Sequence, residues 1–149
     1  NDTKISNILF DAKTKEVLCA IDLDTVMSAS VLNDVGDALR CYTNTGAEDA
    51  QDLSTVSMSL EMFTAYIRGY LSEMGSSLCP AELDNLAFSG RYITFEQVLR
   101  FLMDYLDGDT YYKTKYPEHI LVRARAQYKL LQSMEAQFPQ MCEIVAALR

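Results

Sequence analysis

The helical character of this chain is set by residues 95–106, which read FEQVLRFLMDYL. The apolar side chains in this stretch recur every three or four residues, which places them on one face of an α-helix. The residues that carry the pattern are Phe95, Val98, Leu99, Leu102, Met103 and Leu106. We expect this face to point into the core, and we expect Gly108 to end the helix.

The same spacing predicts helices on either side of this stretch. The apolar residues of Val56–Met74 predict a helix of about five turns that stops at Gly75. The chain restarts at Cys79–Glu82, where Pro stands at the first helical position and Glu at the capping-box position. Two later helices are expected, one carrying Leu121, Ala124, Tyr128, Leu131 and Met134, and a short one beginning at Pro139 with Ile144, Val145 and Leu148 inward.

The first part of the chain follows a different pattern. Residues 7–11 and 16–22 are short, largely apolar and compatible with β-strands, and the polar residues 12–15 between them suit a turn. Together they predict a β-hairpin. The expected fold is therefore α+β, mainly α, in a single domain over residues 1–149, with a short β-hairpin packed on a helical bundle.

Composition and charge narrow the classes of function. The 149 residues carry 21 acidic and 13 basic side chains, a net charge of −8 with the single His neutral. This balance disfavours nucleic acid and anionic membrane surfaces as partners, and no apolar run approaches the ~20 residues of a membrane span. The four cysteines form no C-x-x-C pair, so we expect free thiols and a cytoplasmic protein. Because the sequence starts at Asn1 without Met, we expect it to be a piece of a longer protein.

The N-terminal segment NDTKISN carries the strongest candidate chemistry. Asp2 and Asn7 are separated by four residues, the D-x-x-x-x-N spacing of kinase catalytic loops. In phosphoryl transfer one carboxylate orients the acceptor hydroxyl, while an amide oxygen and a second carboxylate hold Mg²⁺ on the ATP phosphates. Asp22, at the end of the second expected strand, suits the second carboxylate, and Asp24 lies two residues on. The alternative is a solvated polar turn in which Asp22 is an ordinary strand-end residue.

These motifs resemble the C-terminal lobe of the phosphotransferase family that contains aminoglycoside, choline and homoserine kinases. The segments concerned are NDTKISN (1–7), IDLDTVM (21–27), NDVGDALR (33–40) and RFLMDYLDGDTYY (100–112), the last of which is similar to N-acetylhexosamine 1-kinases. The resemblance implies a kinase-like lobe that uses Mg²⁺ and ATP. It also implies that the His of the family's H-x-D motif and the nucleotide-binding N-terminal lobe lie outside these residues.

The resemblance gives individual residues a role, with the acceptor sugar bound by the long helix and the segment after it. Asp104 is expected to hold the guanidinium of Arg100. The candidates are Asp2 and Lys4 for catalysis, Asn7, Asp22 and Asp24 for Mg²⁺, Arg100, Asp104 and Tyr111 for the sugar, and Asp34 for support of the catalytic loop.

Three interpretations of the function remain open. The first is the C-terminal lobe of an ATP-dependent kinase that phosphorylates the anomeric hydroxyl of an N-acetylhexosamine, inactive on its own because the nucleotide cradle is missing. The second is a related kinase for choline, homoserine or an aminoglycoside, and the third is a non-catalytic helical domain whose acidic face binds a basic partner. For Arg100 the alternative is a solvated ion-pair ladder with Glu96 and Asp104. The oligomeric state stays open.

Overall fold

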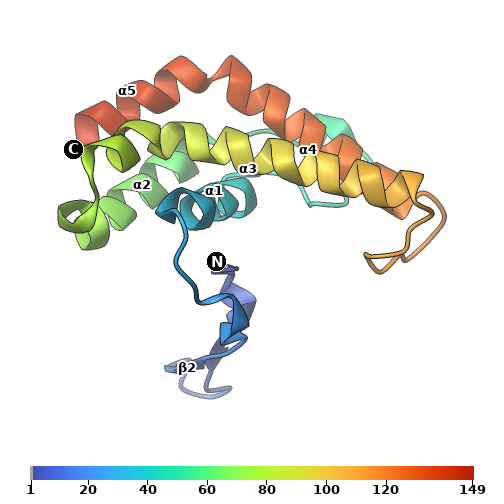
Figure 1. Cartoon of the computed structure of the whole chain (residues 1–149), viewed down its shortest axis with the longest axis horizontal. Coiled ribbons are helices and arrows are strands. Elements are labelled where there is room, and N and C mark those ends of the chain that lie inside the picture. The colour runs from blue at the N-terminus through green and yellow to red at the C-terminus, as the bar shows by residue number, and fades with distance from the viewer. Residues whose placement is uncertain (1) are drawn as a thin grey trace.

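The computed structural model describes residues 2–149, which form two unlike parts (Figure 1). Five α-helices of these residues make a helical body: α1 (Val31–Tyr42), α2 (Leu60–Met74), α3 (Pro80–Leu106), α4 (His119–Ala136) and α5 (Phe138–Leu148). The N-terminal part holds an antiparallel sheet of two strands, β1 (Ile8–Phe10) and β2 (Val17–Ala20), with 3-10 turns at Ile5–Asn7 and Leu23–Thr25. This confirms the α+β, mainly α class and the hairpin predicted from the sequence.

α3 is the central helix of the body. It runs along the molecule with α1 and α2 on one side and α4 and α5 on the other (Figure 1). The backbones of α1 and α3 meet at Gly36, where an added Cβ would lie 2.5 Å from the carbonyl oxygen of Ser89. Only glycine fits this approach, so the pairing of α1 with α3 depends on that residue.

The main core lies between α1, α2, α4, α5 and the first half of α3. Its largest fully buried members are Leu39, Phe63, Ile67, Leu86, Leu130, Met134 and Met141. A smaller cluster of Phe101, Ile120 and Ala124 lies between α3 and α4 at the far end of α3. Burying each large apolar side chain contributes about 1.5–3 kcal/mol, so the stability of the chain resides in the helical body.

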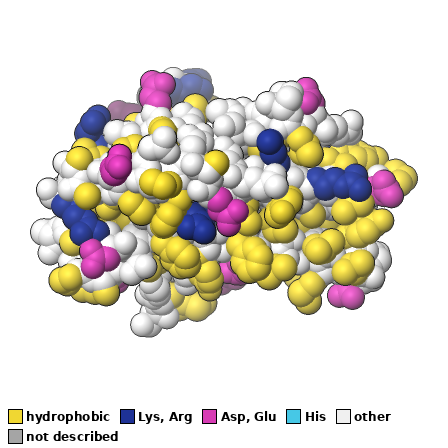
Figure 2. Space-filling view, turned by 90° about the horizontal axis from the view of Figure 1, so that it is seen from above, with side chains coloured by type: hydrophobic (Ala, Val, Ile, Leu, Met, Phe, Trp, Pro, Cys, Tyr) yellow, Lys and Arg dark blue, Asp and Glu magenta, His cyan; other side chains and the backbone are white. Residues whose placement is uncertain are grey.

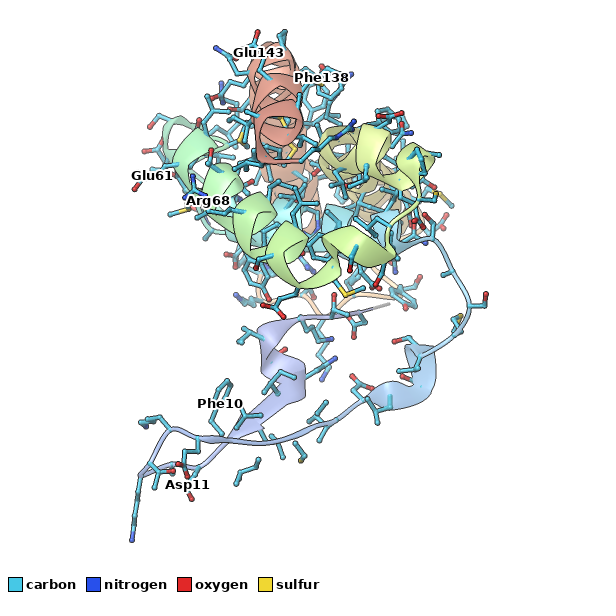
Figure 3. The ribbon with its side chains drawn as sticks, turned by 90° about the vertical axis from the view of Figure 1, so that its left-hand side faces the viewer. Phe10, Asp11, Glu61, Arg68, Phe138 and Glu143 are labelled. Carbon is cyan, nitrogen blue, oxygen red and sulfur yellow. The ribbon has the colours of Figure 1, made fainter. Side chains whose placement is uncertain are left out.

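The hairpin projects from the helices, and the expectation that it packs on the bundle is wrong (Figures 1 and 3). All four residues of β2 are exposed, as are Leu9 and Phe10 of β1, and Figure 3 shows Phe10 and Asp11 far from the helices. The strands have three and four residues, too few to present a face that could cover a helix. The loop before the hairpin makes the contact instead, because the Ile5 N–H donates to the Tyr42 hydroxyl at 3.0 Å.

The helix expected over Val56–Met74 begins four residues later, at Leu60. Its first turn is capped by Ser59, whose hydroxyl accepts the Met62 N–H. Val56 is buried as the periodicity suggested, but it lies in an extended segment before the helix. The apolar spacing therefore reported burial there and not helix.

The restart at Cys79–Glu82 is confirmed, since the Glu82 carboxylate accepts the Cys79 N–H at 2.8 Å at the start of α3. Gly75 follows α2 as expected, although it is right-handed and opens the 3-10 turn Gly75–Ser77. The helices expected around residues 121–134 and from Pro139 are confirmed as α4 and α5.

The apolar face expected to point from α3 into the core points to solvent. Its exposed members are Phe95, Leu99, Leu102, Met103 and Leu106, whereas Thr94, Phe101 and Asp104 are buried. The inner face of α3 is built from small residues, because α1 and α4 approach it closely. The hydroxyl of Thr94 donates to the Gly90 carbonyl at 2.6 Å, so a polar residue is satisfied there without a partner from another helix.

None of the helices described over residues 2–149 combines the length and the apolar composition that crossing a lipid bilayer requires.

Candidate functional site

Residues predicted for catalysis and metal binding border one hollow between the N-terminal loop, the hairpin and α1. The hollow has a volume of about 230 Å³. Its polar lining includes Asp2, Lys4, Asn7 and Asp22, and its apolar lining includes Ile8, Ala20, Ile21, Leu23 and Val26. The hairpin thus brings Asp22 back beside the catalytic-loop candidates, as the sequence predicted. Asp24 is not among the lining residues and lies in the following 3-10 turn.

Side-chain and backbone hydrogen bonds hold the candidate loop together. The Lys4 ammonium donates to the Asp2 carboxylate at 2.7 Å, and the Asn7 side-chain NH₂ donates to the Asp2 carbonyl at 3.1 Å and to its carboxylate at 3.3 Å. The Ile21 N–H donates to the Asn7 carbonyl at 2.8 Å, which sets the following residue, Asp22, beside the loop. Asn7 is buried, so the loop is anchored at this residue.

The charges in this hollow stabilise one another. The hydrogen bond from Lys4 lowers the pKa of Asp2 against the opposing effect of burial, and the Asn7 amide lowers it further. The hydrogen bond to Asp2 raises the pKa of Lys4, and the charges of Asp22 and Asp37 add to this. Asp2 is therefore an ionised acceptor and Lys4 a cation at neutral pH.

The oxygen ligands at this hollow fit Mg²⁺ in kind. The Asn7 amide nitrogen is engaged with Asp2, so its side-chain oxygen is the atom available to a cation, and Asp22 adds a carboxylate. Mg²⁺ keeps several waters and substrate phosphate oxygens in its coordination shell, so two protein oxygens match its usual sites in phosphoryl-transfer enzymes. Within residues 2–149 no group of three or more His, Cys, Asp or Glu side chains could enclose a metal ion.

Asp34, predicted to support the catalytic loop, lies in the first turn of α1. Burial is the main cause that raises the pKa of Tyr66 to about 12, and the charge of Asp34 contributes, as it does at Tyr70. The loop itself contacts the other end of α1, through Tyr42. The supporting role of Asp34 stays a prediction.

The predicted sugar-binding residues line a second hollow, at the far end of α3. This hollow has a volume of about 340 Å³, and its lining consists of Arg100, Met103, Asp104, Asp107, Thr110, Tyr111 and Tyr112. Arg100 is exposed, with its guanidinium 5.9 Å from the centre of the Tyr112 ring. Tyr111 is also exposed and meets Tyr112 edge-on at 4.8 Å. Both side chains are therefore open to a ligand.

Asp104 has another task than the one predicted. Its carboxylate accepts the N–H groups of Tyr111 at 2.7 Å and Tyr112 at 3.1 Å, and the side chain is buried. Burial alone would raise the pKa of Asp104, but these backbone N–H groups lower it. Asp104 therefore fixes the loop after α3. A solvated ladder with Glu96 and Arg100 is not formed, because those two residues are exposed and Asp104 is not.

A buried ion-pair network beside the loop was missed in the sequence. The Arg40 guanidinium bonds Asp37 at 2.9 Å and Glu48 at 2.8 Å, and Arg40 itself is buried. Glu48 also pairs with Arg123, whose guanidinium lies 4.0 Å from the centre of the Phe101 ring. The only signal in the sequence was a charged residue on the inner face of α1, and its partners lie on distant segments.

Arg123 extends this network toward the second hollow. Its guanidinium lies 5.1 Å from the centre of the Tyr112 ring, which lines that hollow. On the opposite side, Asp37 lies close enough to Lys4 to raise its pKa. A continuous set of charged and aromatic groups therefore joins the two candidate hollows through α1 and α4.

Compared with models of known protein families, the chain matches none.

Proposed function

We propose that this chain is the C-terminal lobe of an ATP- and Mg²⁺-dependent small-molecule kinase. The observation that carries the proposal is that Asp2, Asn7 and Asp22 border one hollow although the hairpin separates them in sequence. A carboxylate acceptor, an amide oxygen and a second carboxylate at one place are what phosphoryl transfer requires. The apolar wall of this hollow suits a nucleotide base beside the phosphates.

In this proposal each polar residue of the hollow has one task. Asp2 accepts a hydrogen bond from the acceptor hydroxyl and takes its proton as the oxygen attacks phosphorus. Lys4 places positive charge beside the transferred phosphoryl group. Asn7 and Asp22 would hold Mg²⁺, which neutralises charge on the phosphates when bound. The nucleotide-binding lobe would come from residues outside the 149 described by this sequence, in a cytoplasmic protein.

The acceptor that we propose is an N-acetylhexosamine, phosphorylated on its anomeric hydroxyl. Arg100 and Tyr111 support this, because an exposed guanidinium fork and an exposed tyrosine ring at one hollow suit sugar hydroxyls and a sugar face. The paired rings of Tyr111 and Tyr112 beside Asp107 favour a second candidate, a cationic acceptor such as choline or an aminoglycoside.

Kinetic assays on a protein that includes the nucleotide-binding lobe test this function. ATP turnover is measured with N-acetylhexosamines, choline and aminoglycosides as acceptors. We expect Asp2→Asn to lower kcat by about 10²–10⁴-fold, the usual contribution of a general base. Asp24→Asn is the matched control, because Asp24 does not line the hollow. Equal activity of the two variants would contradict the proposal.

The acceptor site is tested separately. Arg100→Ala is expected to lower kcat/KM for the sugar by about 10- to 150-fold, through KM, because one charged hydrogen bond is lost. Glu96→Ala is the control, as an exposed charge one turn earlier on α3. Unchanged sugar kinetics in Arg100→Ala would remove this residue from the site.

A further inference from the structure

α3 carries an apolar seam that the rest of the described chain leaves open. Its side chains are between 38% and 73% exposed, and they are Phe88, Tyr92, Phe95, Leu99, Leu102, Met103 and Leu106. Apart from Met103, successive members alternate spacings of four and three residues. This alternation is typical of helices that pack along their length against a second helix. Figure 2, which looks down on the helical body, shows hydrophobic side chains spread across the lower half of the view.

The area of the seam is large enough for a stable interface. With roughly 150–250 Å² for a fully exposed large side chain, the exposed fractions leave roughly 700 Å² uncovered on each copy. An exposed apolar patch of more than a few hundred Å² is typical of an interaction surface. Two copies joined through this patch would bury about 1,400 Å², within the ~1,200–2,000 Å² of specific interfaces.

The order of residues along the seam makes it complementary to itself. The three members in its first half are aromatic, and the members at the matching positions of its second half are leucines. If a second copy lies antiparallel, centred between Phe95 and Leu99, each aromatic ring meets a leucine. The pairs are Phe88 with Leu106, Tyr92 with Leu102 and Phe95 with Leu99, each formed twice. A two-fold interface requires this kind of self-complementarity.

The aromatic half of the seam also offers a place for a leucine to insert. A hollow of about 180 Å³ lies there, lined by Phe88, Arg91, Tyr92, Phe95, Leu131 and Glu135. Arg91 is held at its rim by Glu135 at 3.5 Å and lies over the Phe138 ring at 4.2 Å. The hollow is thus bordered by α4 and α5 as well as α3, which gives a leucine of the second copy a hole of fixed shape.

We propose that two copies of this chain form a two-fold dimer in which the α3 helices pack antiparallel through the seam. The dimer does not rest on the proposed kinase activity, because none of its three aromatic–leucine pairs lines either candidate hollow. Each copy carries a net charge of −8, so the copies repel and apolar contact must hold them together. Added salt screens this repulsion, so we expect dimerisation to strengthen as the salt concentration rises.

Sedimentation equilibrium of the 149-residue chain tests the dimer. We expect twice the mass of one chain at micromolar concentration, and an increase of at least about tenfold in Kd for Leu99→Glu, which puts a charge at the seam's centre. Leu18→Glu is the control, because Leu18 is an exposed leucine on the hairpin. Circular dichroism establishes that each variant is folded. A monomeric parent chain, or loss of the dimer in Leu18→Glu with retention in Leu99→Glu, would overturn the proposal.

A pair of charge substitutions tests the antiparallel arrangement. Phe95→Lys and Leu99→Glu each weaken the dimer alone, whereas in the double variant the new lysine of one copy lies opposite the new glutamate of the other, twice. We expect the double variant to regain dimerisation at low salt, with a Kd at least about tenfold below that of either single variant. In a parallel pair the same substitutions oppose like charges. A double variant that stays as weak as the single variants would therefore refute the antiparallel register.

Discussion

The helical body and the N-terminal part of this chain are held in place by different forces. The body buries Phe63, Phe101 and the other core side chains, whereas Asn7 is the only buried residue between residues 2 and 30. The N-terminal part depends on hydrogen bonds: within its own loop, across its hairpin and to Tyr42 of α1. The candidate catalytic residues therefore lie on the part that contributes least to stability. Changes there should alter the site without unfolding the chain.

The largest contrast is expected between two phenylalanines. Phe63→Ala removes a fully buried ring and should lower the free energy of unfolding by about 3–5 kcal/mol. Phe10→Ala removes a half-exposed ring from the hairpin and should change it by no more than about 0.5 kcal/mol. Urea unfolding followed by circular dichroism measures both. Similar losses would mean that the hairpin shares the core of the body.

A smaller loss is expected from the ion-pair network. Arg40→Ala leaves Asp37 and Glu48 without their main cation, and should cost about 2–3 kcal/mol, somewhat less than a fully buried pair because both carboxylates reach solvent. Arg149→Ala, which breaks an exposed pair with Asp84, should cost at most about 1 kcal/mol. The same unfolding assay compares them. Equal costs would show that burial of Arg40 adds nothing.

The pH dependence of unfolding examines the same network more gently. Burial alone would raise the pKa of Glu48, but its hydrogen bonds and charge contacts with Arg40 and Arg123 outweigh burial and lower it. A lowered pKa in the folded state means that this stabilisation is complete above the ordinary Glu value of 4.5 and is lost as the pH falls through the folded value. Glu48→Gln should therefore lose less stability than the parent chain on acidification from pH 6 to 3. A parallel pH profile in both proteins would argue against the pairing.

The smallest effect is expected where the two parts meet. Tyr42→Phe removes the hydroxyl that accepts the Ile5 N–H, so the Ile5 amide should exchange with deuterium about two- to tenfold faster. The free energy of global unfolding should change by no more than about 0.5 kcal/mol. Tyr128→Phe, at an exposed tyrosine of α4, serves as the control for removing a hydroxyl. Hydrogen exchange read residue by residue decides this, and an unchanged rate at Ile5 would dissociate the loop from α1.

Local signals in the sequence predicted the elements better than their faces. The alternation before and after residues 12–15 predicted the hairpin, and Pro80 with Glu82 predicted the start of α3. The inward face of α3 was predicted wrongly because the spacing of Leu99 and Leu102 shows that a face is apolar, not what covers it. The true inner face is marked by Gly90 and other small residues that allow close helix packing, a weaker signal than a row of leucines.

The candidate site was predictable where its residues are linked by short-range geometry. The D-x-x-x-x-N spacing and the hairpin together placed Asp2, Asn7 and Asp22 at one hollow. Arg40 and its partners were not predictable, because Glu48 and Arg123 join it only through the packing of the helices. The inward turn of Asp104 depends likewise on the path of the loop after α3, which no local pattern specifies.

The backbone at two of the candidate carboxylates has a consequence for sequence change. Asp2 and Asp22 both adopt left-handed conformations, with φ of 60° and 61°. Glycine, asparagine and aspartate tolerate this conformation best, so the backbone restricts these positions almost to three residue types before any chemistry is considered. A single-base drift that retained the fold would lead first to asparagine or glycine, and either would remove the carboxylate. Related chains that have lost the activity should therefore keep the same loop and carry asparagine or glycine at these two positions.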